Sequence, residues 1–477
     1  MTFTSFNFLL FFPLVVLLYN IIPQKWRMPF LLVASYVFYI SMQPVYAVLL
    51  AGVTITTYLF ARGISKAGSE KIQHRLEVIG IIVVLLPLAF YKYFNFINDT
   101  IQSVLSSAGL SVSMPHIALV LPVGISFYTF MAISYLVDVY NEEVDFEPNI
   151  LVTGLHLSFF PIVLSGPIER AGNMMPQFRQ MNRSTPSDLT AGLKMMLWGY
   201  FMKLCVADRL GIYLDAVYSN IPHHNGTTFT LTMLLYPFRV YADFGGYSLI
   251  AMGVARCMGL KIMQNFNRPF FAMTISDFWQ RWHISFIKWL TDYIYTPLSF
   301  MLRSWRVWGI MTALMITFFV SGIWHAAEFT SIFWGIFTGT FLSIEALTQK
   351  QRAKLENKYN LKTKWWYILI CCVVVYLIFA FSQIFGRCES VGQAFGVIGK
   401  IFTDRGTLFV DRTTLIYGIV MLILLFAKDF IDEFVPKKLQ LFESKYFVVR
   451  LLAYSAVIIL ILWGGVLDSS QFIYFKF

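Results

Sequence analysis

Apolar segments near the length that crosses a bilayer recur along most of the chain. A transmembrane helix needs about 20 consecutive, mostly apolar residues. The segments that meet or approach this requirement are 6–22, 28–40, 45–61, 76–93, 117–139, 312–323, 329–347, 365–385, 415–427 and 451–466. They predict an all-α polytopic membrane protein in which some of the shorter segments extend or tilt.

The pattern changes between residues 151 and 298. Apolar pieces become shorter there, and Gly, Pro, Arg and Trp interrupt them. Backbone that leaves helical geometry at membrane depth must be buried in protein or line a cavity. We therefore expect broken, re-entrant or interfacial helices around an internal tunnel, and divide the chain into 1–140, 141–350 and 351–477.

Composition and charge agree with a membrane protein. Of the 477 residues, 57% are hydrophobic and 13% are charged, against about 25% charged in soluble domains. The net charge of +11 indicates basic cytoplasmic loops rather than nucleic-acid binding. The alternation of Lys- and Arg-rich loops places both termini outside. The five cysteines show no metal-ligand spacing, so neither a metal site nor a disulfide framework is expected.

One apolar segment, FFVSGIWHAAEFTSIFWGIF (318–337), contains an imidazole and a carboxylate. An ionisable residue inside a span is costly and normally faces the bundle interior or a wet cavity. His325 is therefore a functional candidate, although a packing histidine is the structural alternative. Glu328 follows three residues later and shares a helical face with His325 if the helix continues. Its carboxylate then raises the basicity of the imidazole or forms a simple stabilising pair.

Two further segments concentrate polar groups. In the first, 265–298, helical spacing places His283 with Trp279 on an aromatic face, as in an amphipathic interfacial helix. In the second, 240–260, Asp243 precedes a glycine pair that permits close approach of a ligand or of another helix. Arg239 lies at the spacing for an ion pair with Asp243.

Six blocks, in order, resemble the membrane-bound O-acyltransferase superfamily, in particular its bacterial alginate O-acetyltransferase-type branch. They are LPVGISFYTFMAISYLVDVY, FFPIVLSGPIERAGNMMPQF, VYADFGGYSLIAMGVARCMGL, NFNRPFFAMTISDFWQRWHIS, YIYTPL and GIWHAAEFTSIFWG. The resemblance implies a bundle of about 11 or more transmembrane helices with the catalytic core in 141–350. It also implies a bacterial cytoplasmic membrane location.

The resemblance implies roles for individual residues. His325 would be essential for acyl transfer as a general base, and His283 would be the second histidine of the core. The supporting or orienting residues would be Glu328, Asp243, Trp324 and Asn265. Relatives often have a small or neutral residue where this chain has Glu328.

The acyl donor expected from the resemblance is acetyl-coenzyme A, with an acidic acyl-carrier protein as the alternative. No tightly bound cofactor is expected. The donor's phosphates would meet the basic side chains of Arg268, Arg281 and Lys288. An extracytoplasmic partner of the SGNH type would complete the transfer to a polysaccharide.

The chain closes with DSSQFIYFKF. This aromatic tail is typical of an interfacial anchor. Its Phe-x-Tyr-x-x-Phe spacing also resembles a C-terminal acyl-transfer motif of the superfamily, in which Tyr474 would relay the acyl group. Both interpretations stay open.

Two other functions compete with acetylation of a polymer. Broken helices and buried charges also suit a transporter or flippase, although the sequence contains no visible inverted repeat. A lipid- or protein-directed O-acyltransferase of the same superfamily is the third possibility.

Overall fold

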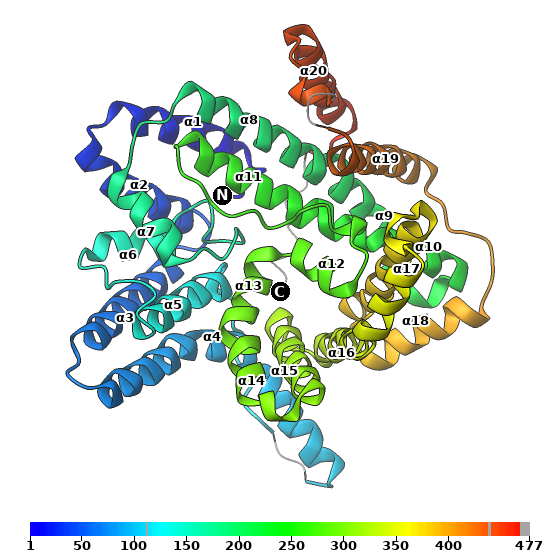
Figure 1. The fold of residues 1–477 in the computed structure, drawn as a ribbon, viewed down its shortest axis with the longest axis horizontal. Helices are drawn as coiled ribbons and strands as arrows, with labels where there is room; N and C mark the ends of the chain where they lie inside the picture. Colours follow the sequence, from blue (N-terminus) through cyan, green and yellow to red (C-terminus); the bar gives the residue numbers. More distant parts are fainter. Residues whose placement is uncertain (111–112, 437–439, 468–477) are drawn as a thin grey trace. The chain divides into compact units, whose positions relative to one another are not determined.

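The computed structural model describes residues 1–110, 113–436 and 440–467. Within these ranges the chain is helical and contains no strand (Figure 1). The helices pack into two units, one formed by 1–196 with 251–263 and the other by 197–250 with 264–477. The expected all-α class is confirmed. The division of the chain into 1–140, 141–350 and 351–477 remains a prediction.

The first unit contains the N-terminal helices. Helices α3, α4 and α5 pack against one another, and α6 packs on α2 and α3. The bounds are α1 (Phe6–Ile21), α2 (Gln24–Ile40), α3 (Tyr46–Lys66), α4 (Glu70–Ser107), α5 (Ile125–Tyr140), α6 (Ile150–Ser158), α7 (Ala171–Gln180) and α8 (Pro186–Tyr200), whose last turn belongs to the second unit.

The predicted span 117–139 is helical only from Ile125 onward. Gly124 precedes the helix in the left-handed conformation, with φ +79°. A Cβ at this position would lie 2.0 Å from the carbonyl oxygen of Val163. Only glycine accommodates both the conformation and the contact, so the helix begins eight residues later than its hydrophobicity suggests.

The second unit holds the remaining helices. Three π-helical turns, η1 (Phe201–Ala207), η3 (Tyr241–Gly245) and η5 (Thr291–Tyr295), lie within longer helical segments. The α-helices are α9 (Asp208–Tyr218), α10 (Gly226–Val240), α11 (Gly246–Cys257, shared with the first unit), α12 (Ile275–Arg281), α13 (Ile284–Leu290), α14 (Thr296–Met301), α15 (Val307–His325), α16 (Phe329–Lys358), α17 (Trp365–Ser382), α18 (Val391–Thr403), α19 (Arg412–Phe434) and α20 (Phe447–Gly464). Short 3₁₀ turns are η2 (Ile221–His223), η4 (Pro269–Phe271), η6 (Arg303–Trp305), η7 (Leu361–Thr363), η8 (Phe385–Arg387) and η10 (Leu441–Glu443).

Apolar helices long enough to cross a membrane number seven within the described part of the chain. They include α3 and α4 in the first unit, and α15, α16, α17, α19 and α20 in the second. Helices α1 and α5 are shorter apolar helices. Many of their large apolar side chains are exposed, as expected for surfaces that face lipid rather than water.

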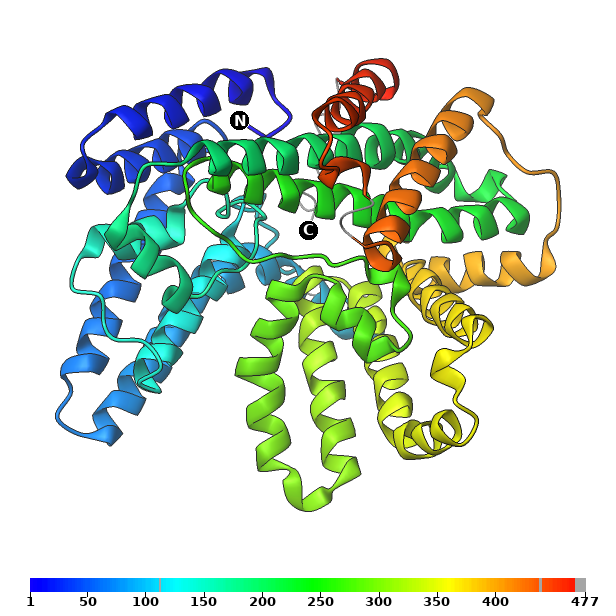
Figure 2. The same cartoon turned by 45° about the horizontal axis from the view of Figure 1, so that its top comes forward.

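Helices α15 and α16 form an antiparallel hairpin (Figure 2). Their backbones approach closely at Gly322 and Gly335. A Cβ on Gly322 would lie 2.4 Å from the Ser331 carbonyl oxygen, and one on Gly335 would lie 2.3 Å from that of Phe318. Small residues allow such close packing between membrane helices. The contact positions the end of α15, where His325 lies, against the start of α16.

Candidate functional site

His325 is the last residue of α15, and the helix does not continue to Glu328. Ala326 is extended, with φ −147°, and Glu328 is the extended N-cap residue of α16, with φ −146°. The shared helical face expected from the i,i+3 spacing is therefore not formed. Glu328 is exposed, and its carboxylate accepts a hydrogen bond from the Thr330 hydroxyl at 3.3 Å.

The segment that holds His283 is also broken. Helix α12 ends at Arg281 and α13 begins at Ile284, with His283 between them in the left-handed conformation at φ +46°. The single helix predicted through this segment is wrong, and the i,i+4 relation between Trp279 and His283 does not apply. The break turns the imidazole inward, where His283 is only 1% exposed.

Asn265 anchors this break from a fully buried position. Its side-chain oxygen accepts hydrogen bonds from the Ser285 backbone N–H at 3.1 Å and from the Ser285 hydroxyl at 2.8 Å. Its backbone oxygen accepts from the N–H of Ile284 at 2.9 Å. The Asn265 amide also donates to the Ser248 hydroxyl at 3.4 Å. These contacts link the start of α13 to α11.

The same amide oxygen determines the tautomer of His283. The Nδ1 atom of His283 lies 3.2 Å from Asn265 Oδ1. Because the Ser285 backbone N–H also donates to that oxygen, the amide orientation is set and Oδ1 acts as an acceptor. Nδ1 must therefore carry the hydrogen, which leaves the lone pair of the neutral ring on Nε2.

Burial lowers the pKa of His283 well below its ordinary value, and the nearby His325 ring lowers it further. The low-dielectric surroundings disfavour the imidazolium form. His283 is consequently neutral near pH 7.

Both histidines line one cavity of about 70 Å³ in the second unit. Phe286 contacts the two rings, with centroid distances of 5.0 Å to His283 and 5.7 Å to His325. Trp324 stacks on Phe286 at 4.1 Å, and Trp334 meets His325 edge-on at 5.0 Å. Trp324 is not on the cavity wall; besides the two histidines, Phe286 and Trp334, the lining residues are Tyr236, Val240, Trp279, Trp282, Ser331, Phe379, Gln383 and Gly386. We call this space the histidine chamber.

Asp243 lies in a buried ion triad rather than on the wall of the chamber. Lys203 Nζ lies 2.7 Å from both Asp243 Oδ1 and Asp208 Oδ1. The lysine and Asp243 occupy the π-helical turns η1 and η3, which pack together. The next residue, Phe244, meets the His283 ring edge-on at 4.6 Å. The triad therefore supports the chamber indirectly.

The ion pair considered between Arg239 and Asp243 does not form. Arg239 instead makes a two-pronged contact with Asp215, at 2.7 and 2.9 Å. Arg387 also donates to Asp215, at 2.7 Å. The glycines after Asp243 serve helix packing, since a Cβ on Gly246 would lie 2.8 Å from the Gly199 carbonyl oxygen.

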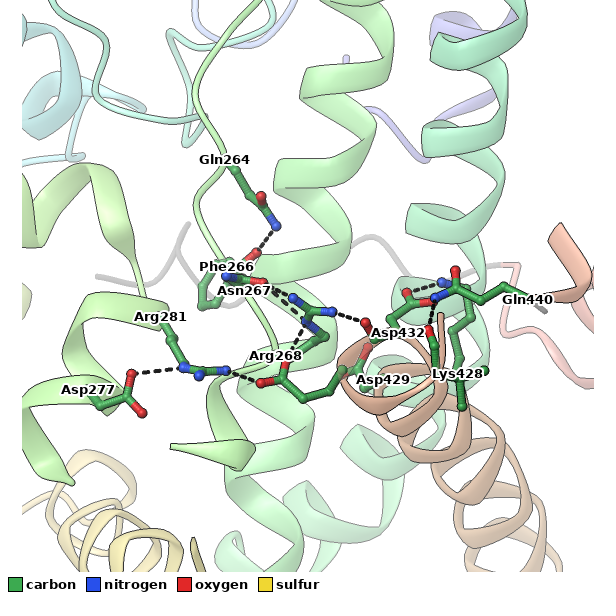
Figure 3. A network of polar contacts seen from close by, with 12 residues as sticks. Gln264, Phe266, Asn267, Arg268, Asp277, Arg281, Lys428, Asp429, Asp432 and Gln440 are labelled. Carbon is green, nitrogen blue, oxygen red and sulfur yellow. Dashed lines mark hydrogen bonds and ion pairs between the residues drawn. The ribbon is translucent and has the colours of Figure 1, made fainter. Parts of the chain in front are cut away.

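The arginines predicted to bind the donor are held by carboxylates of the protein (Figure 3). Arg268 and Arg281 both pair with Glu433, at 3.0 and 2.9 Å. Arg281 also pairs with Asp277 at 2.9 Å, and Arg268 donates to the Asp432 backbone oxygen. Lys288 is exposed on α13. The donor role of all three cations stays a prediction.

Sequence reasoning missed Lys203, Glu433 and Phe286. The lysine had a detectable signal, because it is an ionisable residue within an apolar segment. Glu433 carried no local signal, because its partners are distant in sequence. Phe286 carried none, because it is one of many aromatic residues in its segment. Tyr474 lies outside the described residues. Within the described ranges, no cluster of three His, Cys, Asp or Glu side chains is arranged to hold a metal ion.

The fold and the chamber define a polytopic helical membrane protein with two histidines on one buried, aromatic-lined cavity. A family model described as MBOAT, membrane-bound O-acyltransferase family, matches residues 147–391. The chain is 34% identical over 407 residues to the probable alginate O-acetylase AlgI of Pseudomonas aeruginosa, covering 84% of this chain and 75% of that protein.

Two further relatives are more distant. The peptidoglycan O-acetyltransferase of Helicobacter pylori is 29% identical over 350 residues, covering 68% of this chain and 64% of the relative. The teichoic acid D-alanyltransferase of Bacillus subtilis is 25% identical over 311 residues, covering 62% and 73%. The chain belongs to the membrane-bound O-acyltransferase family. The expected enzyme class, an acyltransferase, is confirmed.

Proposed function

We propose that this enzyme moves an acetyl group from a cytoplasmic thioester donor across the bacterial cytoplasmic membrane for O-acetylation of an extracellular or cell-wall polysaccharide. The observation that carries the proposal is the presence of His325 and His283 on the wall of one cavity. Relatives named as alginate and peptidoglycan O-acetyltransferases support the acetyl group and the polymer class.

In the proposed reaction, His325 acts as the general base. A ring nitrogen of His325 takes the proton from an acceptor hydroxyl as its oxygen attacks the thioester carbonyl carbon. The new C–O bond forms, the C–S bond breaks, and the departing thiolate takes the proton from the imidazolium. The aromatic walls exclude competing water from the acyl group.

The proposed role of His283 follows from its tautomer. The neutral ring directs an Nε2 lone pair away from Asn265 and therefore accepts a hydrogen bond. A hydroxyl has one hydrogen, and in the proposed reaction His325 takes it. Nε2 of His283 would therefore accept a hydrogen bond from a different N–H or O–H group of a substrate, which orients that substrate for attack. Because burial keeps the ring neutral, it orients the substrate without adding charge to the chamber.

The remaining steps lie at the two sides of the membrane. We propose acetyl-coenzyme A as the donor and an SGNH-type protein outside the membrane as the partner that acetylates the polymer. Tyr474 would accept the acetyl group as a phenyl ester, which is more activated than an alkyl ester, and pass it to that partner. Tyr474→Phe should then abolish polymer acetylation while the protein stays folded in the membrane; full activity would remove the relay.

The central experiment compares a His325→Ala strain with wild type and with His74→Ala, a change on an exposed histidine of α4. Exported polymer and its bound acetyl groups are measured separately. We expect His325→Ala to leave polymer exported but without acetyl, and His74→Ala to match wild type. Loss of export would indicate a transporter. Label from acetyl-coenzyme A found in lipid or on protein would indicate that the acceptor is a lipid or a protein and not a polysaccharide. Unchanged acetylation in His325→Ala would refute the proposal.

A further inference from the structure

The histidine chamber shares part of its wall with a second, smaller cavity. This second cavity has a volume of about 20 Å³ and is lined by side chains of α12, α16 and α17, which are mostly apolar, such as Phe337, Phe341 and Val375, and include the hydroxyl residues Thr338 and Ser382. Trp279 and Phe379 line both cavities. These two side chains therefore separate the chamber from an apolar space behind it.

The separating side chains are large, buried and held on several sides. Trp279 and Phe379 are each 6% exposed. The Phe379 ring lies 4.5 Å from Phe278 and 4.8 Å from Trp282, and Trp279 lies 5.2 Å from Phe318. These ring contacts hold both side chains in place between the two cavities. The partition is consequently a fixed boundary of the chamber.

The size of the chamber restricts what it holds. A dry cavity of about 150 Å³ in another protein accommodates benzene, which has six carbons. By that proportion, a chamber of about 70 Å³ accommodates roughly three heavy atoms, the number in an acetyl group. A longer acyl chain would have to enter the space behind Trp279 and Phe379.

We propose that Trp279 and Phe379 form an acyl-length wall, which restricts transfer to the two-carbon acetyl group. This inference rests on the proposed function, because it assumes that the acyl group occupies the chamber. Removing the Phe379 ring would join the two cavities and provide apolar space for a longer chain. Trp279 is the less suitable position to change, because it also contacts Trp334 at 5.8 Å, which in turn contacts His325.

The test uses membranes that contain the full chain, supplied with acetyl-, propionyl-, butyryl- or hexanoyl-coenzyme A. Release of free coenzyme A thiol is measured, and the rate of His325→Ala membranes is subtracted. One methylene in an apolar pocket changes specificity by about 10–200-fold. We therefore expect wild type to use butyryl at least about tenfold more slowly than acetyl. Phe379→Ala should raise the butyryl-to-acetyl ratio by about tenfold or more.

The matched control is Phe337→Ala, which removes the same ring from the second cavity but leaves the partition in place. Its butyryl-to-acetyl ratio should equal that of wild type. Because Phe379→Ala removes a buried ring and risks misfolding, Phe379→Leu is measured as well and should raise the propionyl-to-acetyl ratio.

The outcomes separate the two proposals. If wild-type membranes show no release that depends on His325, the proposed function fails. If wild type uses acetyl but also uses hexanoyl equally well, the wall does not exist. Unchanged ratios in folded Phe379 variants, or an equal change in Phe337→Ala, would also overturn it while leaving the acetyltransferase proposal intact.

Discussion

Asn265 provides a sharp test of how the chamber is built. Its side-chain oxygen accepts three hydrogen bonds, two from Ser285 and one from the His283 ring. Asn265→Ala removes that acceptor from a fully buried position. Each buried donor left unsatisfied costs about 1–3 kcal/mol. Since the three donors share one oxygen, we expect a total loss of about 2–4 kcal/mol of unfolding free energy.

Asn265→Asp separates positioning from stability. The carboxylate has nearly the same shape and accepts from the same three donors, so His283 keeps its hydrogen on Nδ1. However, the added negative charge stabilises the imidazolium and therefore raises the pKa of His283. A raised pKa means that the ring becomes protonated at a higher pH as the pH falls. The neutral, hydrogen-bond-accepting form is then lost earlier than in wild type.

The assay is acetyl transfer by membranes between pH 5 and pH 9, together with thermal unfolding in detergent. We expect Asn265→Asp to move the acidic limb of the activity profile upward and to recover toward wild-type activity at high pH. Asn265→Ala should be less stable and less active across the whole range. If both variants retain the wild-type profile, Asn265 does not have the role in positioning the His283 ring that we assign to it. If Asn265→Asp loses activity equally at every pH, the change acts through packing and not through the ring.

Two other predictions concern the support around the chamber. Lys203→Met leaves the carboxylate of Asp243 buried without its cation, and breaking a buried ion pair in this way costs about 3–5 kcal/mol. The yield of folded protein and its unfolding temperature in detergent measure this loss. An unaltered unfolding temperature would contradict the reasoning. Gly322→Ala forces a Cβ against the Ser331 carbonyl oxygen and should cost about 1–3 kcal/mol through overpacking, with a fall in acetyl transfer as His325 shifts. Gly396→Ala on α18, where no atom lies within 4 Å of the added Cβ, is its control, and equal behaviour of the two would refute the packing argument.

The helices that face lipid were the most predictable part of the fold. Hydrophobicity over about 18 or more residues identifies such a helix without knowledge of its neighbours. Boundaries were less predictable, as the late start of α5 at Ile125 illustrates. Its preceding residues are apolar, but Gly124 adopts a conformation set by contact with Val163, which is 39 positions away in the sequence.

The identity of the chamber histidines was predictable, whereas their surroundings were not. An imidazole in an apolar segment is rare enough to be noticed in one sequence. The partners of the charged residues were missed because local spacing favours i,i+4 pairs. Arg239 reaches Asp215 instead of Asp243, and Lys203 takes Asp243. Tertiary packing decides which charged residues pair, and the spacing of residues along the chain does not indicate these partners.

The backbone at His283 shows why the helical interpretation of this segment failed. A continuous helix from 275 to 290 would satisfy local hydrogen bonding and the aromatic pattern. His283 instead adopts the left-handed conformation, which costs roughly 1–3 kcal/mol for a residue other than glycine. Asn265 offsets that cost by accepting hydrogen bonds from Ile284 and Ser285 immediately after the break. The chain thus departs from the locally preferred helical conformation, and this departure places the His283 ring in the chamber. Such an arrangement is expected where the position of a side chain matters more than the stability of its helix.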